Sequence, residues 1–534
     1  MKRNIFGLLT LIATLLCTAC FDDDSTGILQ NINDIQISGI EETYECTAFI
    51  GESLNIIPVI NGYSENDLKF VWTLYNGQTG KPDSDGNIIE PTIIGTEKQL
   101  SYPVNLSMGS YTLCLTVTSK DNNYSVSKLI NLSVSTEFSQ GFYVLKENEE
   151  GNSDLDLLTI KGEIASDILS KISGAVKGKP RNLSINYGHF YINTDNDQIE
   201  STHTLTITTE DNEIATYRSS DLKLLFDRSN TLYDEMESDE KPYAILRSNT
   251  HSIYISSKGI RQIMADNLYI QMGLMPKNTG RFGFPAIETG GSPFIIYDHS
   301  SYGGYYYWDE INKSFWTGYM MGQGFAPLTK ADGSGSELTQ NLQNYKCLAC
   351  GMNSYNSPNG YFIMEDESTG QRYVYIVKSL TAMAQYFSDR VILKNNSHMA
   401  QANSFSVNGL SAKFIYCLDN GNVYACNLNS PDYAETELSF EGIPAGEEIT
   451  YITNQYWNAM MSDTKSNFNY LIVGTQNGDS YHVYMYNTVG GLPDGTPVKT
   501  IKGKGKLKNV RFLFGSGKFD ENDLTSGQMY PIGD

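Results

Sequence analysis

Long apolar runs are missing from nearly the whole sequence. After residue 24, no stretch is apolar for the about 20 residues that a membrane-spanning helix needs. The apolar run from Ile5 to Leu16 is too short to span a bilayer and directly follows Lys2 and Arg3. A positive segment followed by a short apolar one predicts a signal peptide, so we expect an exported chain and not a membrane-spanning one.

Basic residues are also scarce. The chain has 38 Lys and Arg against 61 Asp and Glu, and removal of the signal peptide leaves only 36 basic residues. Affinity for phosphate groups depends on clustered Lys and Arg that release counterions. We therefore expect neither nucleic acid nor an anionic lipid surface as a partner.

Familiar catalytic and metal-binding motifs are absent. There is no G-x-S-x-G, no H-E-x-x-H, and none of the six His residues is paired at ligand spacing. Cys347 and Cys350 form a CxxC without a second pair nearby, and Asp83 and Asp195 begin segments that lack most ligands of an EF-hand. The sequence thus predicts no catalytic residue, no metal and no cofactor.

Two features leave other interpretations open. The run Glu365-Asp366-Glu367 could supply carboxylates for glycoside hydrolysis if they pair in space, or it could be a solvated turn. Cys417 and Cys426 flank an Asn420-Gly421 turn that would pair residue 417 with 424, so a disulfide there would be strained and structural thiols are expected. The disulfide state stays open for the six cysteines that follow residue 20 in the sequence: Cys46, Cys114, Cys347, Cys350, Cys417 and Cys426.

The residues that are abundant favour strands. Tyr alone occurs 36 times, aromatic residues make up 12% of the chain, and charged residues only 19%. Tyr, Thr, Ile and Val fit the half-buried surface of a sheet, whereas long Ala/Glu/Lys/Leu stretches are nearly absent. The composition predicts an all-β protein.

The end of the signal peptide resembles a bacterial lipobox. The small residues Thr18 and Ala19 precede Cys20, although Cys17 stands where Leu is usual, and an ordinary signal peptide with a chance cysteine is the alternative. The acidic run at 22–24 is similar to the surface-export signal of Bacteroidota lipoproteins. This resemblance implies acylation of Cys20, removal of residues 1–19, a tether over 20–33, and an outer-membrane location, lipid-anchored and facing the cell exterior.

Residues 34–135 have the strand alternation and turn spacing of a small β-sandwich. We expect strands at 54–60, 69–74, 100–106, 110–118 and 125–134, with Trp72 in the core. The strand beginning at Gly109 resembles the G-x-Y-x-x-x-L-x-V strand of PKD and related Ig-like modules. We interpret this domain as a spacer.

Residues 136–534 repeat a unit of apolar strand, turn and Tyr-rich strand. The seven expected hairpins are Gly141 to Ile160, Leu183 to Thr208, Tyr243 to Ser257, Pro293 to Trp316, Tyr361 to Val377, Phe414 to Leu428 and Tyr470 to Tyr486. Their spacing of about 57 residues suits a four-stranded propeller blade plus loops. Asn420-Gly421 and Asn477-Gly478 are hairpin turn signals. We predict a seven-bladed β-propeller, with a large β-sandwich or a β-solenoid as the alternative.

Two aromatic segments are candidates for binding a glycan, because a sugar ring presents an apolar face surrounded by hydroxyls. The candidate residues are Tyr302, Tyr305, Trp308, Asp309 and Glu310 in the first segment, and Tyr456, Trp457 and Asn458 in the second. The alternative is that these aromatic residues alternate into the core. Arg281 could grip a carboxylate or be buried as a structural residue.

Taken together, lipobox, acidic tether, PKD-like sandwich and Tyr-rich body resemble the PKD-like family surface lipoproteins of Bacteroidota. The resemblance implies a non-enzymatic accessory subunit that works with a SusC-like TonB-dependent transporter and a SusD-like lipoprotein in nutrient uptake, with a polysaccharide or oligosaccharide as ligand. No functional residue carries over from the family. A surface glycoside hydrolase or lyase and a pure scaffold are the alternatives.

Overall fold

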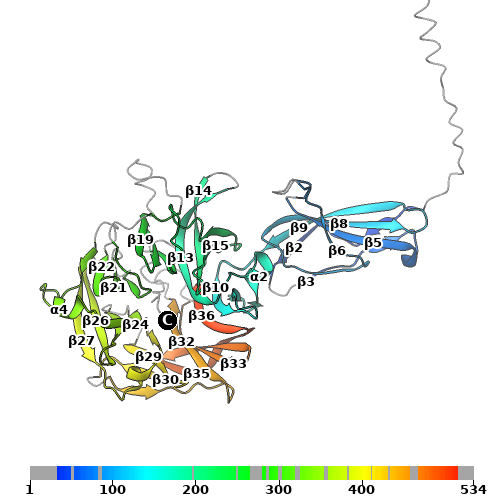
Figure 1. Ribbon diagram of the computed structural model, residues 1–534. Helices are drawn as coiled ribbons and strands as arrows, with labels where there is room; N and C mark the ends of the chain where they lie inside the picture. Colours follow the sequence, from blue (N-terminus) through cyan, green and yellow to red (C-terminus); the bar gives the residue numbers. More distant parts are fainter. Residues whose placement is uncertain are drawn as a thin grey trace, which may run out of the picture. The chain divides into compact units, whose positions relative to one another are not determined.

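The computed structural model describes residues 33–514, except 50–52, 78, 82–86, 195–197, 248–250, 265–279, 284–287, 299–303, 319–324, 354–358, 382–383, 411, 431–432 and 458–466. Strands dominate this part of the chain, which confirms the all-β class (Figure 1). The helices are η1 (Glu65–Asp67), α2 (Ile168–Ile172), α4 (Ser336–Thr339) and α5 (His398–Gln401). No helix in the described part is long and apolar enough to cross a membrane.

The chain divides into two compact units. The N-terminal unit comprises residues up to 44, 54–102 and 110–132, and the C-terminal unit comprises 45–53, 103–109 and the chain from 133 onward.

The N-terminal unit is built on a five-stranded antiparallel sheet. Its order is β2 (Thr43–Thr47), β9 (Ser125–Ser135), β8 (Gly109–Ser119), β5 (Leu68–Tyr75) and β6 (Thr92–Gly95), with smaller pairs β1 (Gln36–Ser38) with β4 (Val59–Asn61) and β3 (Ser53–Ile56) with β7 (Leu100–Pro103). Trp72 is fully buried and its Nε1 donates to the Glu97 carbonyl at 3.0 Å, as expected for the core aromatic. The strand predicted at 54–60 is two strands, because Pro58 cannot donate a ladder hydrogen bond.

The described part of the C-terminal unit contains seven successive sheets. The first sheet joins both ends of the unit and consists of β36 (Lys506–Leu513), β10 (Gly141–Glu147), β11 (Ser153–Thr159) and β12 (Ile164–Ala165). The second sheet is β13 (Pro180–Asn193), β14 (Gln198–Thr209), β15 (Ile214–Arg218) and β16 (Leu224–Asp227), the third is β17 (Pro242–Arg247), β18 (His251–Ser256) and β19 (Gly259–Met264), and the fourth is β20 (Ile295–Asp298), β21 (Gly304–Asp309), β22 (Ser314–Gly318) and β23 (Phe325–Pro327). The fifth sheet is β24 (Tyr345–Asn353), β25 (Asn359–Asp366), β26 (Gln371–Thr381) and β27 (Ala384–Ile392), and the sixth is β28 (Ser404–Val407), β29 (Phe414–Asp419), β30 (Asn422–Asn427) and β31 (Glu435–Glu437). The last is β32 (Glu448–Trp457), β33 (Phe468–Asn477), β34 (Ser480–Val489) and β35 (Leu492–Lys504).

Each of the seven predicted hairpins is an antiparallel pair in a different sheet. Asn420 and Gly421 both have positive φ, as a type I′ turn requires. At Asn477-Gly478, the second predicted hairpin turn, the turn lies one residue later than predicted, because Asn477 pairs with Ser480. Cys417 pairs with Tyr424 as expected, and the cysteines that the structure describes are free thiols.

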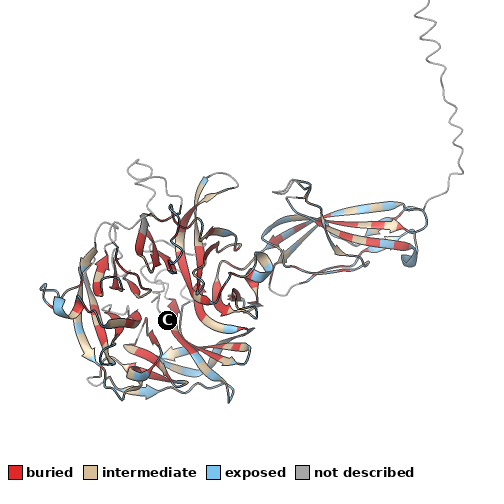
Figure 2. Ribbon diagram, in the orientation of Figure 1, coloured by how far each residue is buried: buried red, intermediate tan, exposed pale blue. Residues whose placement is uncertain are grey.

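Successive sheets pack against each other through their side chains. On β21, Tyr305 and Tyr307 belong to a core shared with the sheet of β17 to β19, whereas Tyr306 and Trp308 belong to a core shared with the sheet of β24 to β27. A strand that is buried on both faces carries large apolar residues at consecutive positions. Figure 1 shows these sheets following one another around a common centre, and Figure 2 shows buried positions along most of their strands.

The strands β32, β36 and β13 of three neighbouring sheets run in the same direction. Between β36 and β13, Asn509 contacts Asn182 at 3.3 Å, and further along both strands the Phe514 N–H donates to the Tyr187 hydroxyl at 3.4 Å. Between β32 and β36, the Phe512 N–H donates to Gln455 Oε1 at 2.9 Å. We call the end where β32, β36 and β13 finish the exit end.

The first and last strands of the C-terminal unit pair with each other. β10 lies between β11 and β36, and its register with β36 runs from Gly141↔Leu513 to Glu147↔Lys506. Next to this pairing, the buried Lys146 ammonium lies 2.7 Å from Asp156 and 2.7 Å from Asp167. Burial opposes the Lys146 charge, but the two carboxylates outweigh it and raise the pKa of the ammonium. The Tyr481 hydroxyl of the adjacent sheet donates to the same Asp156 at 2.5 Å.

Removal of the Lys146 charge should weaken this junction strongly. In Lys146→Met, Asp156 stays buried without its cation, and we expect the free energy of unfolding of the C-terminal unit to fall by about 3 to 5 kcal/mol. Lys161→Met is the matched control, because the Lys161 side chain is 63% exposed and its ion pair with Glu137 is worth less than about 1 kcal/mol. Urea unfolding measures both, and equal losses would show that the buried pair is not important for stability.

Candidate ligand-binding sites

The tyrosine-rich segment is not an exposed aromatic platform. Tyr305 and Trp308 are both 0% exposed, so the expectation that they offer a binding surface is wrong. The reason is their place on β21, where both faces of the sheet are covered by neighbouring sheets. Tyr302 lies outside the described residues.

The two carboxylates that follow are occupied by their own turn. Asp309 is buried, accepts from the Thr289 hydroxyl at 2.8 Å, and accepts from the Asn312 N–H at 3.0 Å. Glu310 accepts from Trp308 Nε1 at 2.6 Å and is ion-paired with Lys313. Asp309 is therefore inaccessible to a ligand, and Glu310 already has two partners.

The second predicted segment is buried as well. Tyr456 is 3% exposed and Trp457 is 2% exposed, and the Trp457 ring stacks on Phe514 with centroids 3.9 Å apart. Both belong to β32, a first strand whose side chains pack between sheets. The expected exposed Tyr-Trp pair is therefore wrong, and Asn458 lies outside the described residues.

One pocket lies at the junction of the first and last sheets of the C-terminal unit, at the exit end. We call it the seam pocket, and its volume is about 270 Å³.

 The residues that line the seam pocket are Gln140, Gly141, Phe142, Thr159, Ile160, Asn467, Phe468, Tyr470, Lys499 and Phe512.

Aromatic rings form one wall of the seam pocket. The Phe142 and Phe512 centroids are 4.7 Å apart, and Phe468 stacks on Tyr470 with centroids 4.7 Å apart. Phe468 and Tyr470 are half-buried, so part of each ring stays open. Burial raises the pKa of the Tyr470 hydroxyl, which therefore stays protonated at neutral pH.

A second pocket, of about 400 Å³, lies beside the end of β13. We call it the basic pocket. Its lining residues are Tyr191, Ile192, Asn193, Thr194, Lys223, Leu224, Leu225, Phe226, Asn230, Tyr233 and Arg281. Among the described residues, this lining contains two cations and no carboxylate, in a chain whose net charge is −23.

His189 and Gly280 lie next to the lining residues Phe226 and Arg281 of the basic pocket. His189 is 1% exposed, stacks on Phe226 with centroids 5.1 Å apart, and donates from Nε2 to the Gly280 carbonyl at 3.0 Å. Burial lowers the pKa of His189 to about 4, so the ring is neutral at pH 7. Gly280 has φ +84°, and a Cβ there would lie 2.0 Å from the Phe190 carbonyl oxygen.

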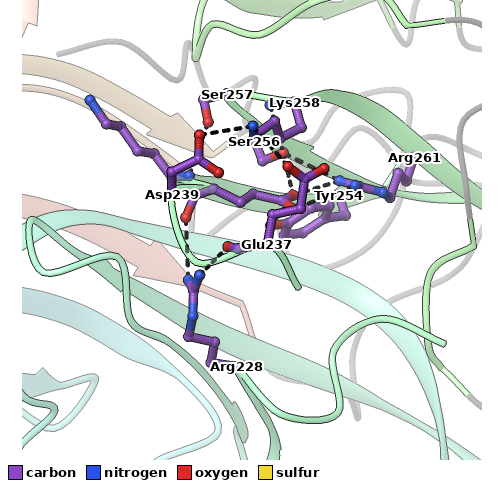
Figure 3. Close-up of polar contacts among 10 residues, drawn as sticks. Arg228, Glu237, Asp239, Tyr254, Ser256, Ser257, Lys258 and Arg261 are labelled. Atoms are coloured by element: carbon purple, nitrogen blue, oxygen red, sulfur yellow. Dashed lines mark hydrogen bonds and ion pairs between the residues drawn. The ribbon is translucent and has the colours of Figure 1, made fainter. Parts of the chain in front are cut away.

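The charged clusters outside these pockets are engaged in ion pairs. The buried Glu240 accepts from Arg261 at 2.6 Å, from the Ser256 hydroxyl at 2.6 Å, and from the Tyr254 hydroxyl at 3.0 Å. Figure 3 shows Arg261, Tyr254 and Ser256 together with the neighbouring pair of Lys258 and Asp239. This cluster joins the chain before β17 to β18 and β19.

The predicted carboxylate run is similarly occupied. Glu365 pairs with Lys346 at 2.8 Å and with Arg372 at 2.8 Å. Burial opposes its charge, but the two cations outweigh it and lower the pKa of Glu365, whereas a general acid needs a raised one. Among the described residues, no group of three His, Cys, Asp or Glu side chains could hold a metal ion.

Sequence reasoning missed both pockets because each combines distant segments. Phe142 and Phe512 meet only through the pairing of β10 with β36, and no spacing rule relates them. Arg281 was singled out for its charge, but its neighbours Tyr191 and Lys223 come from other strands and loops.

Residues 20–180 match the model of the PKD-like family, which supports the PKD-like part of the chain. A search of curated proteins finds no match. Among solved structures, the chain is similar to a quinoprotein alcohol dehydrogenase-like protein from Bacteroides thetaiotaomicron, with 13% identity, 91% of this chain and 100% of that chain covered, and a TM-score of 0.46.

A DUF4784 family protein from Bacteroides caccae is similar at 10% identity, with 77% of this chain and 97% of that chain covered and a TM-score of 0.28. These likenesses are distant, and we draw no functional conclusion from them.

The buried His189 should make stability depend on pH. Its folded pKa of about 4 lies below the ordinary 6.5, so its contribution is complete above pH 6.5 and is lost as the pH falls towards 4. Because the unfolded chain takes up a proton at His189 more readily than the folded one, we expect the free energy of unfolding to fall by about 3 kcal/mol from pH 7 to pH 4. His189→Gln keeps a hydrogen-bond donor but does not titrate. The difference in unfolding free energy between wild type and variant, measured by urea unfolding, should therefore change by about 3 kcal/mol between pH 7 and pH 4. A constant difference would contradict the assignment.

Proposed function

We propose that the seven sheets of the C-terminal unit are the blades of a seven-bladed β-propeller. The supporting observations are the seven successive sheets, the cores shared between neighbours, and the pairing of β10 with β36, which joins the two ends of the unit. In this arrangement the exit end is one face of the propeller, and both pockets lie on it. Loops and strand ends at such a face commonly carry ligand sites.

The protein's function, in this proposal, is non-enzymatic ligand binding as an accessory subunit of a SusC/SusD-type TonB-dependent uptake complex at the cell surface, with a glycan as ligand. The observation that carries the binding part is the seam pocket. Its half-buried Phe468 and Tyr470 rings can stack on the apolar face of a sugar. Gln140 and Asn467 in its lining bring amide groups suited to sugar hydroxyls.

The surface location is supported by the sequence. Cys20 follows a short apolar segment and small residues, and the acidic run at 22–24 follows it directly. One acyl chain gives only marginal membrane binding, so stable anchoring needs several chains on the cysteine. The tether and the N-terminal unit then separate the C-terminal unit from the anchor along the sequence.

Replacement of the anchoring cysteine tests the location. Cys20→Ser removes the acylated thiol, and we expect the protein to leave the membrane fraction and to lose incorporation of labelled palmitate. The neighbouring substitution Thr18→Ser keeps a small residue before the cleavage site and should leave both unchanged. Palmitate labelling of Cys20→Ser equal to wild type would contradict lipidation at this residue.

Truncation of one ring tests the seam pocket. In Tyr470→Ala the stacking surface is lost, and we expect affinity for a retained neutral polysaccharide to fall roughly thirtyfold, a loss of about 2 kcal/mol. Affinity electrophoresis through gels containing amylopectin, xylan, galactomannan or dextran measures this. Tyr75→Ala, at a ring that is 36% exposed in the N-terminal unit, is the control. Lack of retardation in every gel, or equal retardation of both variants, would contradict neutral-glycan binding at the seam pocket.

A further inference from the structure

The Arg281 side chain differs from the other arginine side chains that the structure describes. Each of those donates to a carboxylate, a carbonyl or a hydroxyl: Arg181, Arg218, Arg228, Arg261, Arg372, Arg390 and Arg511. Arg281 is exposed and has no hydrogen bond or ion pair with any described residue. A guanidinium of this kind is available to a carboxylate or a sulfate.

The backbone on both sides of Arg281 is held in place. Before it, the Gly280 carbonyl accepts from His189. After it, Phe282 is 1% exposed, its N–H donates to the Thr231 carbonyl at 3.0 Å, and its carbonyl accepts from the Tyr233 N–H at 3.0 Å. A binding group on a fixed backbone loses less freedom when it contacts a ligand.

Two carboxylates on the strands and turns beside the basic pocket have partners of their own. Glu200 accepts from the Tyr191 hydroxyl at 2.6 Å and from Asn193 at 2.9 Å. Asp221 is ion-paired with Arg218 at 2.5 Å. Arg218 offsets the charge of Asp221, and Glu200 is hydrogen-bonded, whereas Lys223 and Arg281 line the pocket itself.

The remaining lining suits a sugar ring. Tyr233 is 49% exposed and Leu224 is 43% exposed, so both offer apolar surface to a ligand. Asn193, Thr194 and Asn230 add amide and hydroxyl groups to the lining. A volume of about 400 Å³ lies within the range of small-molecule sites.

We propose that the basic pocket binds an anionic saccharide, with Arg281 and Lys223 at its carboxylate or sulfate group and Tyr233 against its ring. This proposal goes beyond the neutral-glycan site at the seam pocket and does not depend on it. The pocket would select charged sugar units, and the seam pocket uncharged ones.

Calorimetric titration of the purified lipoprotein in detergent tests the proposal. The probes are trigalacturonate, its methyl ester, and a sulfated galactose trisaccharide. We expect at least one anionic probe to bind, and the first and third probes distinguish a carboxylate from a sulfate. Since a hydrogen bond to a charged group is worth about tenfold or more in affinity, Arg281→Met should weaken that binding by at least that factor, and Arg281→Lys by less.

Lys506→Met is the matched control, because Lys506 is 63% exposed and stands at the start of β36, away from the exit end. It should bind the anionic probe as wild type does. The proposal is overturned if neither anionic probe binds, or if Arg281→Met binds the anionic probe as tightly as Lys506→Met does. It is also overturned if trigalacturonate binds and its methyl ester binds equally tightly. Retention of neutral polysaccharide by Arg281→Met would show separately that the seam pocket still works.

Discussion

The pairing of β10 with β36 is the constraint on which the C-terminal unit depends. It joins residues more than 350 positions apart in one sheet and brings the last sheet against the first. Open sheet edges invite pairing with other chains, and a pairing of this kind covers two of them. The buried contacts of Lys146, Asp156 and Tyr481 lie at the same junction. Removal of Lys146 would leave the Asp156 carboxylate buried without its counterion.

The same pairing creates the seam pocket. Gly141 and Phe142 open β10 beside the end of β36, and Phe468 opens β33 in the adjacent sheet. The basic pocket forms differently, because its lining includes Arg281 from the chain after β19, next to Gly280, whose carbonyl accepts from His189. Two pockets with distinct linings, one aromatic and one cationic, thereby lie at the exit end.

Local patterns predicted the elements well and the site poorly. Alternation and turn residues were sufficient for the seven hairpins and for Trp72, because these depend on neighbours in sequence. They failed for Trp308 and Trp457, since exposure depends on which sheet covers a strand. The partners of Arg281 could not be predicted, because contacts between β13, β16 and the segment at Gly280 arise only in the folded chain.

The most direct test of the proposed role is purification of the tagged protein from the membranes of its native cells in mild detergent, with mass spectrometry of the proteins that co-purify. The account predicts recovery of a TonB-dependent transporter and a SusD-like lipoprotein in amounts comparable to the tagged chain. Recovery of the protein alone, under conditions that keep other transporter complexes intact, would contradict its role as a subunit of an uptake complex.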